Sequence, residues 1–156
     1  MAFKLHTEAR DWFKKISGSE PLNTLFDLYH ICLTLGLASK RFESEGDSMD
    51  EFMDDFTIRY RPFQSLMIGG MIAAVLARKG ISVSDRCSVA QEIGRMVSGD
   101  TTRGDLTADG FRELNGYALG GFNYLRENFD APPQHAVWFL SRYSQLLSET
   151  GAPPKI

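Results

Sequence analysis

The stretch LNGYALGGFNYLRENF, residues 114–129, decides how this chain folds. Its apolar residues recur at intervals of three and four, which is the spacing of one face of an α-helix. Yet it contains three glycines within six residues, Gly116, Gly120 and Gly121. Each glycine inside a helix lowers the stability of that helix by roughly 1 kcal/mol relative to alanine. We therefore expect another backbone to pack closely against this helix, because close packing would offset that penalty.

A second predicted helix, PFQSLMIGGMIAAVLARKG, has a similar composition. Small residues recur along it at intervals of four in two adjacent ridges, Gly69, Ala73 and Ala77 in one and Gly70 and Ala74 in the other. Such ridges let two helix backbones come close together. The simplest hypothesis is that the two glycine-bearing helices pack on each other inside the domain. The alternative is that one ridge is exposed and receives a helix from another subunit.

The ridge formed by Gly116 and Gly120 is the better candidate for contact with another chain. Its neighbours along the helix are polar, among them Glu113 and Asn123, so this ridge is predicted to point away from the core. The predicted interface residues are Gly69, Gly70, Ala73, Gly116, Gly120 and Gly121.

The other segments are also typical of helices, with glycine and proline between them. Helical patterns cover approximately residues 7–17, 19–37, 48–56, 62–79, 84–98, 107–129 and 130–149. No segment alternates clearly enough between apolar and polar residues to be a strand. The sequence therefore predicts an all-α fold: a single compact bundle of six or seven helices over residues 1–150, followed by a mobile tail at 151–156.

The composition is that of an ordinary globular protein, with 43% hydrophobic residues, 24% charged residues and a net charge of −3. Negative charge is concentrated in RFESEGDSMDEFMDDF, residues 41–56, which contains seven acidic residues and one arginine. Ser48 and Glu51 have the spacing of a capping box, so we expect a short acidic amphipathic helix here. The run lacks the ligand spacing of a calcium-binding loop, and no metal is expected. The acidic docking segment is predicted to comprise Asp50, Glu51, Asp54 and Asp55.

The sequence favours a cytoplasmic protein without a cofactor. Its longest apolar stretch spans 12 residues, from Leu66 to Ala77, which is well short of the ~20 residues that a membrane span needs. The amino-terminal residues contain no apolar run typical of a signal peptide. Cys32 and Cys87 fall in predicted helices without the spacing of metal ligands, and we expect both to be buried and reduced.

One polar stripe on the predicted helix at 19–37 is a candidate for catalysis. Asn23, Asp27, His30 and Thr34 recur at helical intervals on an otherwise apolar helix. Asp27 could orient His30 for general-base catalysis. No nucleophile or oxyanion donor accompanies this pair in the sequence, and such stripes are more often solvated faces. We therefore expect no catalytic residues, and a small hydrolase-like enzyme that uses Asp27 and His30 is the third hypothesis.

Basic residues support the second hypothesis, contact with nucleic acid. Arg59 and Arg61 flank Tyr60, an arrangement suited to phosphate and base-stacking contacts. The predicted helix at 84–98 is close to neutral, unlike a DNA recognition helix. Nucleic acid is therefore an alternative partner and not the favoured one. The candidate cations are Arg59, Arg61, Arg78, Lys79, Arg86 and Arg103.

The favoured hypothesis is a non-enzymatic helical accessory or adaptor protein that acts by binding protein. It would assemble with itself or serve as the small subunit of a larger bacterial complex, such as a nucleic-acid-processing or phage-defence complex. The class of complex is suggested by what small helical proteins commonly do, and no residue of this chain carries it.

Overall fold

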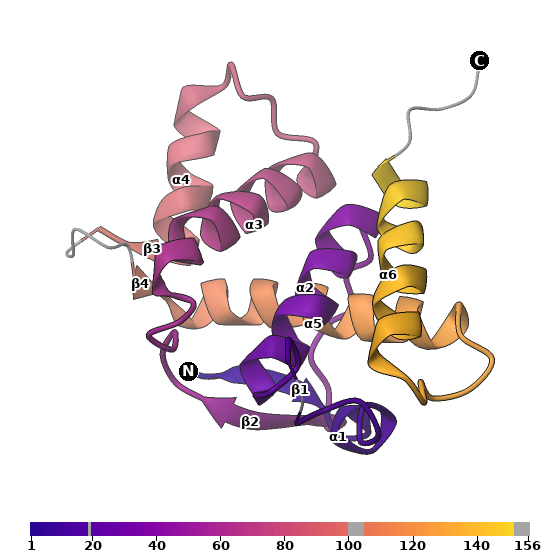
Figure 1. The fold of residues 1–156 in the computed structure, drawn as a ribbon. Helices are drawn as coiled ribbons and strands as arrows, with labels where there is room; N and C mark the ends of the chain where they lie inside the picture. The colour runs from indigo at the N-terminus through magenta and orange to yellow at the C-terminus, as the bar shows by residue number, and fades with distance from the viewer. Residues whose placement is uncertain (19, 100–104, 152–156) are drawn as a thin grey trace, which may run out of the picture.

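The computed structural model describes residues 1–18, 20–99 and 105–151, and in these ranges the fold is mostly helical (Figure 1). This part of the chain contains six α-helices: α1 (Ala9–Trp12), α2 (Leu25–Ser39), α3 (Gln64–Lys79), α4 (Arg86–Met96), α5 (Ala108–Glu127) and α6 (Ala136–Gly151). A 3-10 turn, η1 (Arg61–Phe63), precedes α3. The two antiparallel sheets are β1 (Phe3–His6) with β2 (Met49–Met53), and β3 (Val97–Ser98) with β4 (Asp105–Leu106). The predicted mobile tail, apart from Gly151, lies outside the described residues.

The prediction of a mainly helical chain is confirmed, and the two small sheets are a departure from the predicted all-α bundle. The largest departure concerns the acidic segment, which forms the strand β2 and not an amphipathic helix. Residues Lys4 and Leu5 of β1 pair with Glu51 and Asp50 of β2. The register shifts next to Phe3, which pairs with Met53. Pairing with a distant strand satisfies the backbone of this segment, and that outweighs its local helical spacing.

Helix α5 is the longest of these elements, and it contacts α2, α3, α4 and β1. It begins as the sequence predicts, because the Thr107 side chain accepts a hydrogen bond from the backbone N–H of Gly110 at 3.1 Å. The end of α4 lies against this first turn. A Cβ at Gly110 would come within 2.2 Å of the carbonyl oxygen of Met96. Glycine is therefore required where α4 meets α5.

Helices α2 and α5 approach each other almost to backbone contact. A Cβ on Gly121 would lie 1.7 Å from the carbonyl oxygen of Cys32, and one on Gly36 would lie 1.8 Å from the carbonyl oxygen of Tyr117. Both distances are far below any contact that a real side chain makes. The glycines of α5 thus serve close packing, as predicted, but their partner is α2 and not the second glycine-bearing helix.

The chain that leaves α2 covers the remaining glycines of α5. It turns at Lys40, whose φ is 58°, in the left-handed region. The carbonyl oxygen of Arg41 would then lie 2.1 Å from a Cβ on Gly120, and the ring of Phe42 lies 2.2 Å from the position of a Cβ on Gly116. The prediction that the Gly116 and Gly120 ridge points away from the core is wrong. Its polar neighbours do not mark an exposed ridge, because Asn123 donates to Glu43 of this covering segment and Glu113 is paired with Arg78 and Arg95.

Aromatic rings fill the space between the first sheet and the helices. Phe3 is fully buried, with the rings of Phe26, Phe56 and Phe111 each at 5.0 Å and that of Tyr29 at 5.3 Å. All four are edge-on to Phe3, which is a favourable arrangement of aromatic quadrupoles. This cluster joins β1 to α2, α5 and the segment after β2, so the core is continuous from the sheet into the helices.

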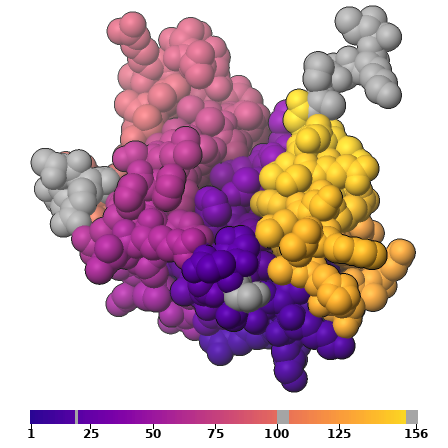
Figure 2. Space-filling model, viewed as in Figure 1, coloured from indigo at the N-terminus to yellow at the C-terminus, as the bar shows by residue number. Residues whose placement is uncertain are grey.

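Helix α6 packs on α2, where the Tyr143 hydroxyl donates to the carbonyl of Ile31 at 2.8 Å. Helix α3 also contacts α2. Figure 2 shows α3 with α4 and, across the molecule, α6, with α2 visible between them. Each of these outer helices therefore turns one side to the core and leaves another side free.

The two cysteines differ. Cys32 is buried in the contact between α2 and α5, and burial raises the pKa of its thiol. Cys87 is exposed near the start of α4, so the prediction that both are buried is wrong for Cys87. The reason is that α4 is a peripheral helix on which only Met96 is fully enclosed.

We expect Gly121→Ala to lower the free energy of unfolding by about 3 kcal/mol or more, because the new methyl group would force α2 and α5 apart. Gly94→Ala is the matched control, since this glycine of α4 has open space around it. There the gain in helix propensity should raise stability by up to ~1 kcal/mol. Urea unfolding of both variants measures the difference, and similar stabilities for the two would contradict the close contact.

Candidate protein-binding surfaces

One side of α3 is exposed although its residues are small or apolar. The opposite side is buried through Met67, Met71 and Val75, which fixes the orientation of the helix. The exposed or half-buried side, which we call the α3 face, comprises Leu66, Gly69, Gly70, Ala73 and Ala77.

The α3 face has no charge of its own. No Asp, Glu, Lys or Arg occurs from Gln64 to Ala77, yet Leu66 is 74% exposed. At Gly69 an added Cβ would meet no described atom within 4 Å, and at Gly70 it would meet only the tip of Leu37, at 3.5 Å. Protein surfaces normally carry interspersed charges, and a contiguous apolar area marks a site of interaction. The α3 face is therefore a candidate protein-binding surface.

The predicted interface residues thus divide into two groups. Gly69, Gly70 and Ala73 lie on the α3 face and are accessible. The glycines of α5 are buried under this chain's own backbone and side chains, so no other chain can reach them in this fold. Only the first group remains a candidate for binding.

The acidic segment is exposed along β2 and just after it. Asp50, Glu51 and Asp54 are exposed and form no ion pair with a described residue, whereas Asp55 lies 3.3 Å from the guanidinium of Arg61. In contrast to these exposed carboxylates, the apolar residue Phe52 of β2 is half-buried, and its ring packs against that of Tyr29 at 5.5 Å between ring centres. The strand is therefore structural and its charges lie outside the core. Their role in docking stays a prediction.

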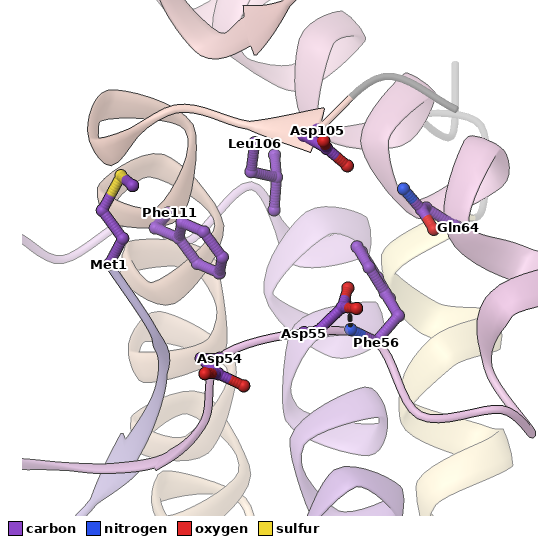
Figure 3. A pocket seen from close by; sticks show the side chains of 8 residues that line it. All are labelled: Met1, Asp54, Asp55, Phe56, Gln64, Asp105, Leu106 and Phe111. Atoms are coloured by element: carbon purple, nitrogen blue, oxygen red, sulfur yellow. Dashed lines mark hydrogen bonds between the residues drawn. The ribbon is translucent and has the colours of Figure 1, made fainter. Parts of the chain in front are cut away.

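A cavity of about 410 Å³ lies beside this segment (Figure 3). Figure 3 shows Asp105 across the cavity from Asp54 and Asp55, with apolar side chains between them. In the described ranges, no three His, Cys, Asp or Glu side chains lie close enough together to hold a metal ion. The cavity is lined by Met1, Asp54, Asp55, Phe56, Gln64, Asp105, Leu106 and Phe111.

Sequence patterns did not reveal this cavity, because its walls come from the first residue of the chain, from the segment after β2, from α3, from β4 and from α5. Only the two aspartates after β2 belong to the predicted docking segment. Asp105 is brought to the cavity by the pairing of β4 with β3, which is a contact that no local periodicity predicts.

A second apolar area, on α6, was also missed. Val137 and Trp138 are 76% and 77% exposed. Three hollows on the surface share Trp138 in their walls. A tryptophan at helical spacing in a sequence looks like a core residue, and this one is not. We call this area the α6 face and define it as Val137, Trp138, Ser141, Arg142 and Gln145.

The candidate cations for nucleic acid are mostly neutralised. Arg78 binds Glu113 at 2.7 Å, and Lys79 binds Glu92 at 3.0 Å. Arg95 joins the two carboxylates, so α3, α4 and α5 share one ion network. Such pairing lowers the positive potential that nucleic acid would need.

The remaining cations do not restore a basic patch. Arg59 lies 3.6 Å from Glu20, and Arg61 is paired with Asp55. Arg86 is exposed at the start of α4 and has no ion pair with a described residue. Arg103 lies outside the described residues. The arrangement thus gives the nucleic-acid hypothesis little support.

Asp27 has a structural role in the described chain. One carboxylate oxygen accepts hydrogen bonds from the backbone N–H groups of Asn23 and Thr24, and the other accepts one from the Tyr60 hydroxyl at 2.5 Å. Burial alone would raise the pKa of Asp27, but the hydrogen bonds from Tyr60 and Thr24, together with nearby Arg59, hold it below its ordinary value. The carboxylate therefore caps α2 and binds Tyr60.

Asp27 does not orient His30 for general-base catalysis. Its Nδ1 is buried and has no hydrogen-bond partner among the described residues. Burial lowers the pKa of His30, which the nearby carboxylate of Asp27 offsets only in part. The imidazole is therefore neutral near pH 7, and its ring lies 5.3 Å from that of Tyr60. Asp27 and His30 are near neighbours without the hydrogen bond that a dyad needs.

No model of a known protein family, no curated protein sequence and no solved structure matches this chain. Among the described helices, none has both the length and the apolar character required to cross a membrane. The function must therefore be inferred from the surfaces themselves.

We expect Asp27→Asn to destabilise the protein by about 2 kcal/mol near pH 7, because the variant loses charged hydrogen bonds at the start of α2. The folded pKa of Asp27 lies below the ordinary value of 3.8. Its stabilisation is therefore complete above that ordinary value and is lost as the pH falls through the folded pKa. Unfolding of both proteins across this pH range should show the difference disappear in acid. Exposed Asp47→Asn is the control, and an equal loss there would contradict the assignment.

Proposed function

We propose that the protein is a non-enzymatic helical adaptor that binds a helix of another protein on the α3 face. The observation that carries this proposal is an exposed helix side with no charged residue from Gln64 to Ala77 and with open backbone at Gly69. A glycine in an exposed helix lowers the stability of that helix by roughly 1 kcal/mol relative to alanine, and only packing against another group would offset this loss. A partner helix would supply that packing.

A helix fits this surface better than a loop does. Gly69, Ala73 and Ala77 are spaced by four residues and form a straight row, into which the side-chain ridge of a second helix can pack. Leu66 lies at the amino-terminal end of the row, and the half-exposed ring of Phe63 precedes it. Large apolar side chains beside a row of small residues would become buried when the partner binds, and such residues contribute most of the binding energy of an interface.

Charges at the two ends of the α3 face favour a partner that is acidic at its ends. Arg59 and Arg61 precede the face and are about half exposed. Arg78 and Lys79 follow it and are about one third exposed. Each of these side chains already has a carboxylate partner within the chain, but an arginine or lysine head group has more N–H donors than one carboxylate uses, so a carboxylate of the partner could bind there as well. Charge complementarity of this kind sets the orientation of a partner and its rate of association.

The wider hypothesis belongs to this proposal as well: a cytoplasmic small subunit of a bacterial complex, such as a nucleic-acid-processing or phage-defence complex. Nucleic-acid contact and hydrolase-like catalysis are less well supported. Their candidate residues are largely occupied within the chain, the cations by carboxylates and Asp27 by the start of α2.

The test compares Gly69→Leu with Gly94→Leu, since both glycines lie in exposed helix and have no described atom near an added Cβ. Both variants should fold and should melt at the parent's temperature or above it, because leucine is the better helix former. Gly69→Leu should lose a bound protein at least tenfold, because the side chain stands where the partner helix must approach. Gly94→Leu should retain it.

The measurement is quantitative affinity purification of the tagged chain from the organism that encodes it, followed by reconstitution with the purified partner. The partner's binding segment should be a helix with acidic residues near its ends. Equal recovery by the two variants would contradict the proposal, and so would a partner that binds through nucleic acid in a salt-dependent manner. Ala73→Glu and Ala90→Glu provide an independent pair, on the α3 face and on exposed α4 respectively.

A further inference from the structure

The α6 face is exposed without serving the core. Phe139, Tyr143 and Leu146 bury the opposite side of the helix, so the packing of α6 does not depend on Trp138. Exposed tryptophan is uncommon on a surface that meets only water, and tryptophan is among the residues that most often dominate binding. The three hollows around its ring leave room for apolar groups beside it.

The charged side chains among the described residues that line the hollows around Trp138 are Lys15 and Arg142, and both are basic. No Asp or Glu of the described ranges lines any of the three hollows, although the whole chain has a net charge of −3. Lys15 lies in one hollow, and its ammonium group donates to the side-chain oxygen of Gln134 at 2.8 Å, without a described carboxylate beside it. Arg142 lines the other two hollows, and its distance to Glu149 is a long 3.7 Å. An occupant of this surface should therefore be acidic with apolar groups.

The acidic segment at β2 of this chain combines negative charge with exposed apolar side chains. Asp50, Glu51 and Asp54 are exposed and lack a described ion pair, as set out above. Met53 and Ile58 are exposed large apolar side chains in and near the segment, and Ile58 is 87% exposed. The acidic segment thus combines negative charge with apolar groups, which complements the α6 face in both respects.

One molecule cannot join these two surfaces to each other. Figure 1 shows β2 and α6 on different sides of the molecule, with α1 and part of α5 between them. We infer that the α6 face of one copy binds the acidic segment of a second copy, with Trp138 packed beside Met53 and Ile58. Lys15 and Arg142 then face the unpaired carboxylates.

This contact joins two different surfaces that lie on different sides of the molecule, so we infer a head-to-tail contact and not a reciprocal two-fold dimer. Each bound copy still has one free surface, so the association continues into a ring or an open chain. The contact uses neither the α3 face nor its partner helix, and the inference is independent of the proposed adaptor function.

The test is light scattering of the purified chain over a range of concentrations, at low and high salt. The parent should form assemblies larger than a dimer, and salt should weaken them because carboxylates and cations are paired across the contact. Trp138→Ala should associate at least tenfold more weakly. The triple variant Asp50→Asn, Glu51→Gln, Asp54→Asn should do the same, and both should melt like the parent because the substituted side chains are exposed.

Mixing the two variants gives the decisive result. Trp138→Ala keeps an intact acidic segment, and the triple variant keeps an intact α6 face. An equimolar mixture should therefore form a dimer of one copy of each variant and nothing larger. Leu66→Ala, which alters an equally exposed apolar residue on the α3 face, should associate like the parent.

Three results would overturn the inference: a parent chain that stays monomeric at high concentration, a variant that associates as strongly as the parent, or a mixture that stays monomeric. If the parent is monomeric but a different acidic protein binds it in a Trp138-dependent way, the occupant is that protein and not a second copy. Retention of the α3 partner in any of these cases would leave the adaptor proposal standing.

Discussion

The structure depends on the backbone contact between α2 and α5. Gly36 and Gly121 allow it, since each lies where any Cβ would overlap a carbonyl oxygen of the opposite helix. With the helices this close, no side chain separates them, and the chain that leaves α2 must pass directly over α5. Lys40 makes that turn in the left-handed region, and the following residues lie on Gly120 and Gly116. The glycines of one helix therefore determine the path of two other segments.

The same path completes a buried polar site at Asn115, which is fully buried. Its amide nitrogen donates to the carbonyl of Ala2 and to Glu45, and its oxygen accepts from the backbone of Lys4 and from the Tyr29 hydroxyl, all at 2.9–3.0 Å. Every hydrogen-bonding position of the side chain is used, so its burial leaves no unpaired group. One amide thus fixes β1 relative to α2, α5 and the covering segment, and β1 in turn supplies the edge on which β2 pairs.

This chain of contacts shows what sequence patterns can and cannot predict. The cap at Thr107, the helical path of α5 and the close approach at its glycines follow from local residue types, and all are observed. The identity of the helix that packs on α5 does not follow from local residue types, because it depends on Gly36, a single glycine in the apolar helix α2. The acidic segment has the local spacing of a helix, but pairing with β1 decides its structure. Spacing singled out Gly69, Gly70 and Ala73, which are accessible in the structure, and their role in binding stays a prediction. The α6 face was not predicted, because spacing alone does not distinguish an exposed tryptophan from a core one.

A core built on two helices in near contact also explains why the outer helices can leave a side exposed. The largest buried side chains come mainly from β1, α2 and α5 and from the residues around α1, while α3 and α6 contribute one side each. Stability then depends little on Leu66, Gly69 or Trp138, whose surroundings are open. We therefore expect substitutions at these positions to preserve the fold, so apolar residues there are better explained by binding than by packing. Because α3 and α6 lie on either side of α2 (Figure 2), the α3 face and the α6 face are separate surfaces. In the proposed adaptor, one outer helix would hold a partner helix while the other would connect the chain to the next copy.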